Sequence, residues 1–240
     1  MLSATAVPFM LSPTIEDYLK AIYKLQVRHD PPVSTSAVAD AMEVSSASVT
    51  NMVQRLDELG MLVYESYRGV TLTEAGTKVA LEIIRHHRLL ELYLKEVMDY
   101  SWEQLHEEAE HLEHHISEEF ESKLEELLDY PTHDPHGHPI PSRDGTVAEV
   151  SARPLVHVKA GTSVQVHHLE DADPKLLHHL EDLGLMPRTR VDVEERAPFD
   201  GPLTLTVHTP DGPKTEVVGR TVAAAVFVSD DVPQGRPDGV

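Results

Sequence analysis

The sequence predicts a mainly α-helical chain with some β-structure: a winged helix-turn-helix, a helical domain and a small C-terminal β-barrel. Short amphipathic helices precede a β-rich stretch at 61–73, long helical periodicity covers about 75–130, and short β-rich runs follow residue 150. A Pro/Gly-rich stretch, PTHDPHGHPIPSRDG, occupies 131–145 and ends the helical block. We therefore expect three domains, at residues 1–74, 75–145 and 146–240.

The composition excludes several classes of chemistry. The 240 residues include no cysteine, which rules out disulfides, thiolate metal sites and cysteine nucleophiles. No apolar run approaches the roughly 20 residues that a membrane helix needs. The N-terminal MLSATAVPFML lacks the basic start and the length of a signal peptide. We expect a cytoplasmic protein.

Charge is distributed unevenly along the chain, whose net charge is −21. Residues 1–75 carry 5 basic and 9 acidic side chains, whereas residues 76–150 carry 6 and 18, together with 9 of the 16 histidines. Carboxylates and imidazoles concentrated in one segment suggest a site for divalent metal. A solvated acidic helix face would have the same composition, so composition alone leaves both interpretations open.

The first block predicts three helices and a hairpin. A helix begins at Ser12-Pro13-Thr14, with Thr14 as the expected N-cap, and either Ser34 or Thr35 caps a second. A third follows Ser45-Ser46 and ends at Gly60. Two short β-rich runs around Tyr67-Arg68-Gly69 then predict a hairpin.

Two short helices joined by a tight turn and followed by a hairpin are typical of a winged DNA-binding domain. The third helix would lie in the major groove, where small hydroxyl side chains approach phosphates and an amide can read a base edge. The expected DNA contacts are Ser45, Ser46, Ala47, Ser48, Thr50, Asn51, Arg55 and Arg68. A helical protein-interaction domain without DNA contact is the alternative interpretation.

The second block carries the metal-ligand pattern. One helix is predicted over about 74–98, and another from 101 or 102 to 128, broken once at most. In a continuous helix, spacings of 4, 3 and 1 place four ligand-type side chains on one face: His106, Glu110, Glu113 and His114. On the preceding helix, His87 and Glu91 are one turn apart. Carboxylates with few imidazoles favour Mn²⁺, Fe²⁺, Co²⁺ or Zn²⁺. A solvated helix face and incidental binding at His133, His136 and His138 remain alternatives.

The third block predicts a small β-barrel with one helical piece at 174–183. Glycine and proline punctuate short runs such as VDVEE, LTLTVH and TEVVG, which indicates several short strands joined by tight turns. The last residues, SDDVPQGRPDGV, are expected to be a disordered tail.

The chain resembles the diphtheria toxin repressor family of iron- and manganese-dependent regulators over residues 12–228. The segments that carry the resemblance are TIEDYLKAIY at 14–23, SSASVTNMVQRLDELGML at 45–62, YRGVTLTEAG at 67–76, HHRLLELYL at 86–94, HEEAEHLEHHIS at 106–117 and GHPIP at 137–141. The segments LEDLGLMPRTRVDV and RAPFDGPLTLTV resemble the SH3-like barrel of this family and of ferrous-transport accessory proteins.

The resemblance implies two metal sites. The family's primary site falls on Asp17, Glu110, Glu113 and His114, and its ancillary site on His87, Glu91 and His106. Carboxylates at 17 and 110 match manganese-responsive members, so we expect Mn²⁺ first and Fe²⁺ second, with other divalent transition metals substituting in vitro. Lys20 departs from the pattern, because manganese-responsive members without the barrel can carry a further glutamate there. The barrel would lend ligands to the ancillary site, for which His168, Glu170 and Asp171 are the nearest candidates.

The resemblance also implies a function: a homodimer that binds double-stranded operator DNA when metal is bound, repressing metal-transport genes. Metal would clamp Asp17 to the segment that carries Glu110, Glu113 and His114, and would set the spacing of two winged helices for half-sites roughly 34 Å apart. Neither an enzyme nor a membrane partner is expected. The alternatives are a metal-dependent hydrolase, a regulator that senses an organic ligand, and a metal buffer or chaperone.

Overall fold

The computed structural model describes residues 11–170 and 173–230. Asp171 and residues 231–240 of the predicted tail lie outside this range. The chain divides into two compact units, which we describe separately. The first comprises the chain up to His87 with Leu112–Ser117 and Pro141–Thr146; the second comprises Arg88–His111, Glu118–Ile140 and the chain from Val147 onward.

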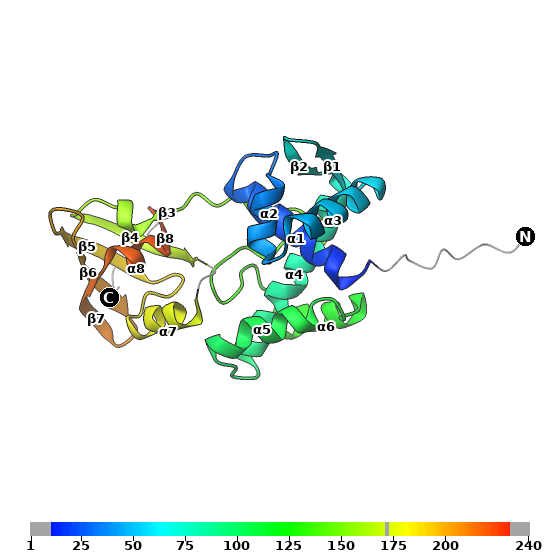
Figure 1. The fold of residues 1–240 in the computed structure, drawn as a ribbon. Coiled ribbons are helices and arrows are strands. Elements are labelled where there is room, and N and C mark those ends of the chain that lie inside the picture. Colours follow the sequence, from blue (N-terminus) through cyan, green and yellow to red (C-terminus); the bar gives the residue numbers. More distant parts are fainter. Residues whose placement is uncertain (1–10, 171–172, 231–240) are drawn as a thin grey trace, which may run out of the picture. The chain divides into compact units, whose positions relative to one another are not determined.

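The first unit contains the predicted winged helix (Figure 1). Its elements are α1 (Pro13–Arg28), α2 (Thr35–Met42), α3 (Ser46–Glu58), β1 (Leu62–Glu65) and β2 (Gly69–Leu72). The two strands pair antiparallel, with Leu62 opposite Leu72. Apolar side chains from all five elements form one buried core, which includes Ile15, Leu19, Ile22, Val38, Val49, Val53, Leu56, Leu62 and Val70. The members of this core on α1, α2 and α3 recur at the spacing of an amphipathic helix, so each helix buries one apolar face.

Local signals set the helix boundaries. Ser34 Oγ accepts a hydrogen bond from the backbone N–H of Ala37, and Ser45 Oγ accepts one from Ser48, so both serines cap their helices as predicted. The prediction for α1 was wrong by two residues: Ser12 is the N-cap and Pro13 occupies the first turn. Proline is favourable there because its missing N–H and fixed φ suit a helix start.

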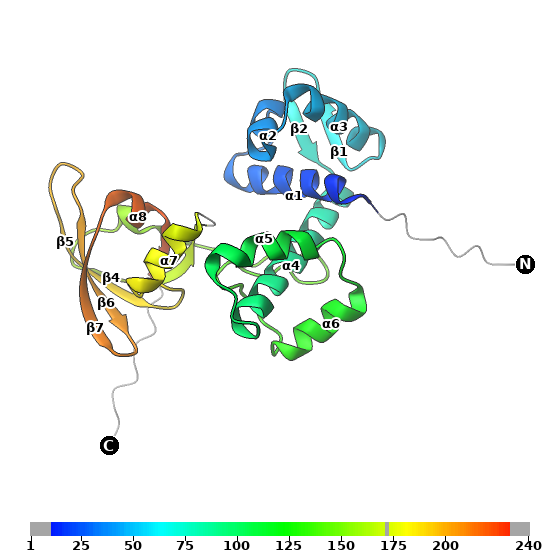
Figure 2. The same cartoon turned by 60° about the horizontal axis from the view of Figure 1, so that its bottom comes forward.

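Three helices follow the wing: α4 (Glu74–Glu96), α5 (Trp102–Leu112) and α6 (Glu118–Leu127) (Figure 2). The second helical stretch, expected to be broken once at most, is broken at residues 113–117. The prediction that Glu113 and His114 share a helix face with His106 and Glu110 was wrong, because Glu113 and His114 lie in the turn after α5. Three glutamates in the first turn of α6 suit the positive end of its helix dipole.

The C-terminal part of the second unit is a six-stranded antiparallel sheet with strand order β3-β8-β4-β5-β6-β7. Its elements are β3 (Arg153–Pro154), η1 (Leu155–His157), β4 (Thr162–Leu169), α7 (Pro174–Asp182), β5 (Arg190–Arg196), β6 (Leu203–Thr209), β7 (Gly212–Val218), α8 (Arg220–Ala224) and β8 (Val226–Ser229). Alternate residues of the strands are buried, including Val164, Val166, Val191, Val193, Leu203, Leu205, Val207, Val226 and Val228. Among the described residues, no helix has both the length and the apolar character needed to cross a membrane.

Candidate metal centre

A histidine in the turn after α5 joins that turn to α1 within the first unit. His114 Nε2 lies 2.9 Å from Asp17 Oδ1, and His114 Nδ1 lies 2.6 Å from Glu16 Oε2. The imidazole therefore contacts two consecutive carboxylates on the first turns of α1. Its side chain is only 7% exposed, so these contacts are shielded from water.

Glu113 is fully buried beside His114 and forms an ion pair with Lys20. Lys20 Nζ donates to both carboxylate oxygens of Glu113, at 2.8 and 2.9 Å. His87 Nδ1 lies 2.5 Å from Glu113 Oε2, and His86 Nδ1 lies 3.1 Å from the Glu113 carbonyl oxygen. A buried carboxylate requires such partners, because desolvation of an unpaired charge is costly. These contacts fix the orientation of the Glu113 side chain.

Three of the predicted primary ligands converge. One ligand atom from each of Asp17, Glu113 and His114 lies within 4.8 Å of the other two. His114 Nε2, which faces Asp17, is also 3.6 Å from Glu113 Oε1. Two carboxylates and one imidazole at this spacing can hold a hard or borderline divalent cation.

The second unit contains two of the three predicted ancillary residues, Glu91 and His106, together with Glu110 and His136. Glu91 Oε1 lies 3.3 Å from His106 Nδ1 and 3.6 Å from His136 Nε2. His106 Nε2 lies 3.6 Å from Glu110 Oε1 on the same helix. Glu91 and His136 are buried, whereas His106 and Glu110 are partly exposed. This group of carboxylates and imidazoles is also suited to a divalent cation.

The other residues predicted to bind metal do not form a single group with these. His87, on α4, is one helical turn before Glu91 and contacts Glu113 and Lys20. His168, on β4, stacks on Phe227 with ring centroids 4.5 Å apart and lies 4.9 Å from His138. Glu170 is exposed just after β4, and Asp171 is outside the described residues.

The predicted DNA-binding residues form an exposed surface on the first unit. Ser45, Ser46, Ala47, Ser48 and Asn51 are exposed at or near the start of α3, Thr50 is half-buried, and Arg55 is exposed in the last turn of the helix. The Thr50 hydroxyl donates to the Ser46 carbonyl oxygen at 2.9 Å. Arg68, exposed at the tip of the wing, pairs with Glu65 at 2.8 Å. Small side chains at the helix start permit close approach to a DNA backbone.

Sequence reasoning missed two residues of these clusters. Glu16 was overlooked, although it directly precedes Asp17 and lies in the acidic first turn of α1. His136 was considered only as an incidental ligand, because a Pro/Gly-rich loop carries no periodicity that relates it to α4. Its contact with Glu91 spans 45 positions of the chain, so only the fold brings the two together.

A winged helix whose first helix lies against a cluster of carboxylates and imidazoles defines the class of metal-responsive DNA-binding regulators. Family models support this class over most of the chain. Residues 10–70 match the iron dependent repressor N-terminal DNA binding domain, residues 73–142 match the metal binding and dimerisation domain of the same repressors, and residues 153–230 match the FeoA domain. The chain belongs to the iron-dependent repressor family, whose members are transcriptional repressors rather than enzymes.

Individual relatives agree with this assignment. The chain is 34% identical over 194 residues to the iron-dependent repressor IdeR of Mycobacterium leprae, covering 75% of this chain and 84% of the relative. It is 36% identical over 121 residues to the HTH-type transcriptional regulator MntR of Bacillus subtilis, covering 50% of this chain and 84% of the relative. A solved manganese-dependent transcriptional repressor in complex with manganese superposes with a TM-score of 0.80 at 34% identity, covering 89% of this chain and 98% of the other. This protein is therefore a metal-dependent DNA-binding repressor that acts as a homodimer.

Proposed function

We propose that Mn²⁺ activates this repressor for operator binding, with Fe²⁺ as the second candidate, and that Asp17, Glu110, Glu113 and His114 hold the ion. The observation that carries the proposal is the approach of Asp17, Glu113 and His114 to within 4.8 Å of one another. Glu110 belongs to the set by resemblance. It lies on α5, whereas Glu113 and His114 lie in the turn that follows this helix.

The donor chemistry supports manganese. The proposed set offers three carboxylates and one imidazole, and the chain contains no cysteine to select a softer ion. Oxygen donors suit Mn²⁺, whereas imidazole and thiolate donors favour metals later in the Irving–Williams order. We further propose that the regulated genes encode metal transport and that the protein acts in the cytoplasm, where operator DNA is found.

Lys20 supports one ion, and not two, at this centre. Its side chain is 6% exposed, and its ammonium group contacts both oxygens of Glu113. A fixed positive charge on this side of Glu113 repels a second dication, because the buried environment screens charge poorly. The primary centre is therefore mononuclear in this proposal.

An ancillary site is proposed around Glu91 and His106, with His87 one turn earlier on α4. The support is the 3.3 Å approach of His106 Nδ1 to Glu91 Oε1 and the burial of both His87 and Glu91. His136 extends the set, since its Nε2 lies 3.6 Å from the same Glu91 oxygen. His168 and Asp171 are proposed as ligands on the resemblance only.

The residues around the proposed primary centre have different roles. In this proposal the Glu16 carboxylate accepts a hydrogen bond from His114 Nδ1–H, which orients the ring and leaves Nε2 facing Asp17 and Glu113. Lys20 and His87 hold Glu113 in place. When bound, the ion supplies two positive charges that offset the repulsion between the carboxylates of α1 and those of the 110–114 segment. The position of α1 is thereby fixed, and with it the winged helix that α1 is part of.

DNA contact is proposed at the exposed start of α3 and at the wing. Ser45, Ser46, Ala47, Ser48, Thr50 and Asn51 would approach the major groove, and Arg55 and Arg68 would contact phosphates. Few cations are involved, so hydroxyl and shape contacts carry much of the interaction.

Operator binding by a Glu110→Ala variant tests the proposal. The variant should remain a dimer but lose metal-stimulated binding, measured at fixed salt with Mn²⁺, Fe²⁺, Zn²⁺ or a chelator. Glu107→Ala, an exposed change on the same helix, is the matched control and should behave as wild type. Normal metal-stimulated binding by Glu110→Ala would show that the primary-site assignment is wrong. Wild-type binding that a chelator leaves unchanged would instead indicate an organic effector.

A further inference from the structure

Four histidines gather in the second unit, outside the two carboxylate-containing sites. His133 and His138 come from the loop after α6, and His167 and His168 come from β4. Their rings form a continuous chain: His133 to His167 is 6.1 Å between centroids, His167 to His168 is 5.3 Å, and His168 to His138 is 4.9 Å. None of these residues takes part in the mechanism proposed above except His168, and that only by resemblance.

The loop is held against β4 by its backbone. The N–H of Leu169 donates to the carbonyl oxygen of His136 at 2.8 Å. Gly137 has φ +90°, and a Cβ there would come within 2.3 Å of the His167 carbonyl oxygen, so only glycine permits this approach. The Asp134 carboxylate accepts the backbone N–H groups of His136 and His138, both at 2.9 Å, which shapes the loop. The juxtaposition of the two histidine pairs is thus built into the fold.

An irregularity in β4 brings its two histidines together. Consecutive residues of a strand normally point to opposite faces of the sheet. The pairing of β4 with β8 shifts register between Val166 and His168, and such bulges redirect side chains. His167 Nδ1 and His168 Nδ1 consequently lie 3.1 Å apart. Two nitrogen ligands of one tetrahedral Zn²⁺, each about 2.05 Å from the ion, lie about 3.3 Å apart, which is close to this spacing.

Three of the imidazoles have lowered pKa values. Burial, as the largest cause, lowers the pKa values of His133 and His167, and neighbouring positive or titrating groups lower them further. Burial also lowers the pKa of His168 to about 3, with contributions from His138 and His167.

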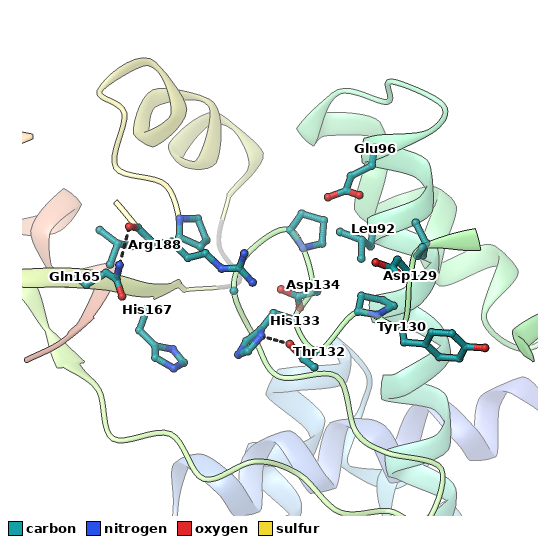
Figure 3. A pocket seen from close by; sticks show the side chains of 16 residues that line it. Leu92, Glu96, Asp129, Tyr130, Thr132, His133, Asp134, Gln165, His167 and Arg188 are labelled. Carbon is teal, nitrogen blue, oxygen red and sulfur yellow. Dashed lines mark hydrogen bonds between the residues drawn. The ribbon is translucent and has the colours of Figure 1, made fainter. Parts of the chain in front are cut away.

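The surrounding charges permit a cation. His133 and His167 line a cavity of about 760 Å³ that gives access from solvent (Figure 3). The cavity is also lined by three carboxylates, those of Glu96, Asp129 and Asp134, and by one guanidinium, that of Arg188. Asp134 Oδ2 lies 3.4 Å from both His138 Nδ1 and Arg88 Nε. The carboxylates therefore outnumber the two arginines around the cluster.

We propose that His138, His167 and His168, with His133 beside them, form an additional site for a borderline divalent cation, with Zn²⁺ as the first candidate. Imidazole-rich sets without sulfur select Zn²⁺, Ni²⁺ or Cu²⁺ over Mn²⁺, so this site differs in selectivity from the carboxylate centre. A cation there links the loop after α6 to β4. The proposal goes beyond the proposed function and does not depend on it.

Metal stoichiometry of the full-length protein tests the site. Chelator-competition titrations with Zn²⁺ and, separately, with Mn²⁺ compare wild type with a His138→Gln/His167→Gln double variant, which leaves His168 in place. The double variant should bind one Zn²⁺ fewer per chain and the same number of Mn²⁺ ions. His178→Gln/His179→Gln, which removes two adjacent exposed histidines from α7, is the matched control and should keep the full Zn²⁺ count.

Thermal unfolding of the metal-free proteins shows whether the double variant folds. If its midpoint is lowered, single changes on the loop serve instead, and His138→Gln should weaken Zn²⁺ binding at this site at least tenfold. Equal Zn²⁺ counts and affinities in wild type and in the folded variants would overturn the proposal. If the wild-type protein does not bind Mn²⁺, that result would contradict the proposed primary centre but not this histidine site.

Discussion

His114 takes its role from the two carboxylates that flank it. Glu16 lies 2.6 Å from Nδ1 and Asp17 lies 2.9 Å from Nε2, so one nitrogen can be oriented by a hydrogen bond while the other faces the ligand cluster. Carboxylate partners of this kind set the tautomer of a ligand histidine and raise its basicity. Glu16 is therefore a positioning residue, and Asp17 is a proposed ligand.

Replacement of Glu16 should separate these roles. Glu16→Ala removes the acceptor of the His114 Nδ1 proton and should weaken Mn²⁺ binding about 10- to 100-fold. Glu16→Gln keeps an acceptor oxygen and should weaken it less than about tenfold. Calorimetric titration with Mn²⁺ measures both. Equal affinities for the two variants and wild type would remove Glu16 from the site.

Lys20 has a structural role that can be measured without metal. Its ammonium is buried against Glu113, and breaking a buried ion pair by removing one partner typically costs about 3–5 kcal/mol. Lys20→Gln should lower the free energy of unfolding in chelator by about that amount, as measured with urea. Lys24→Gln, one turn along α1 and partly exposed, should cost about 1 kcal/mol or less. Similar losses for both variants would contradict a special role for Lys20.

At the scale of elements, α3 combines helix capping with DNA approach at one end. Ser45 caps the helix and is exposed, and its hydroxyl lies 2.9 Å from the Ser48 hydroxyl. The same end presents backbone N–H groups and the positive end of the helix dipole, which attract phosphate. The wing, β1 and β2, packs into the same core through Leu62 and Val70.

Substitutions at Ser45 should distinguish stability from DNA binding. Ser45→Ala loses the cap and should cost about 1 kcal/mol of unfolding free energy. Ser45→Asp keeps a capping acceptor and should retain stability, but its negative charge should weaken operator binding at least tenfold at fixed salt. Wild-type operator affinity for Ser45→Asp would mean that this end of α3 does not face phosphates.

The helix that carries His106 and Glu110 ends earlier than the sequence pattern predicts. Residues 113–117, EHHIS, contain no proline or glycine, so helix propensity does not mark the break. A usable signal was present, because Ser117 directly precedes the acidic first turn of α6. The turn releases Glu113 and His114 from the helix, and both residues contact α1 in the first unit.

At the scale of the whole molecule, an acidic chain must bind a polyanion. The net charge of the chain is −21. The winged-helix segment carries the smallest excess of acidic side chains, with 5 basic and 9 acidic residues in 1–75. Long-range repulsion therefore opposes DNA binding, and salt screens it. Bound dications reduce the negative charge and, in the proposed function, also fix the position of α1.

Metal should stabilise the folded protein measurably. If Mn²⁺ binds only the native state, a free concentration of 100 times its Kd adds about 2.7 kcal/mol to the unfolding free energy. Asp17→Asn should lose most of this gain, whereas Asp40→Asn, an exposed change on α2, should retain it. Unfolding in urea with Mn²⁺ or chelator gives the comparison. An undiminished gain in Asp17→Asn would exclude Asp17 as a ligand.

The sequence by itself determined the order of winged helix, metal helices and β-rich C-terminal part, and most of the candidate ligands. Periodicity, capping residues and ligand spacing are local properties, so they can be read along the chain. Only the tertiary structure decided which side chains meet: Lys20 with Glu113 across 93 positions, Glu16 with His114 across 98, and the loop histidines with those of β4. Such contacts depend on how elements pack and where a turn or bulge redirects a side chain, and local sequence does not encode either.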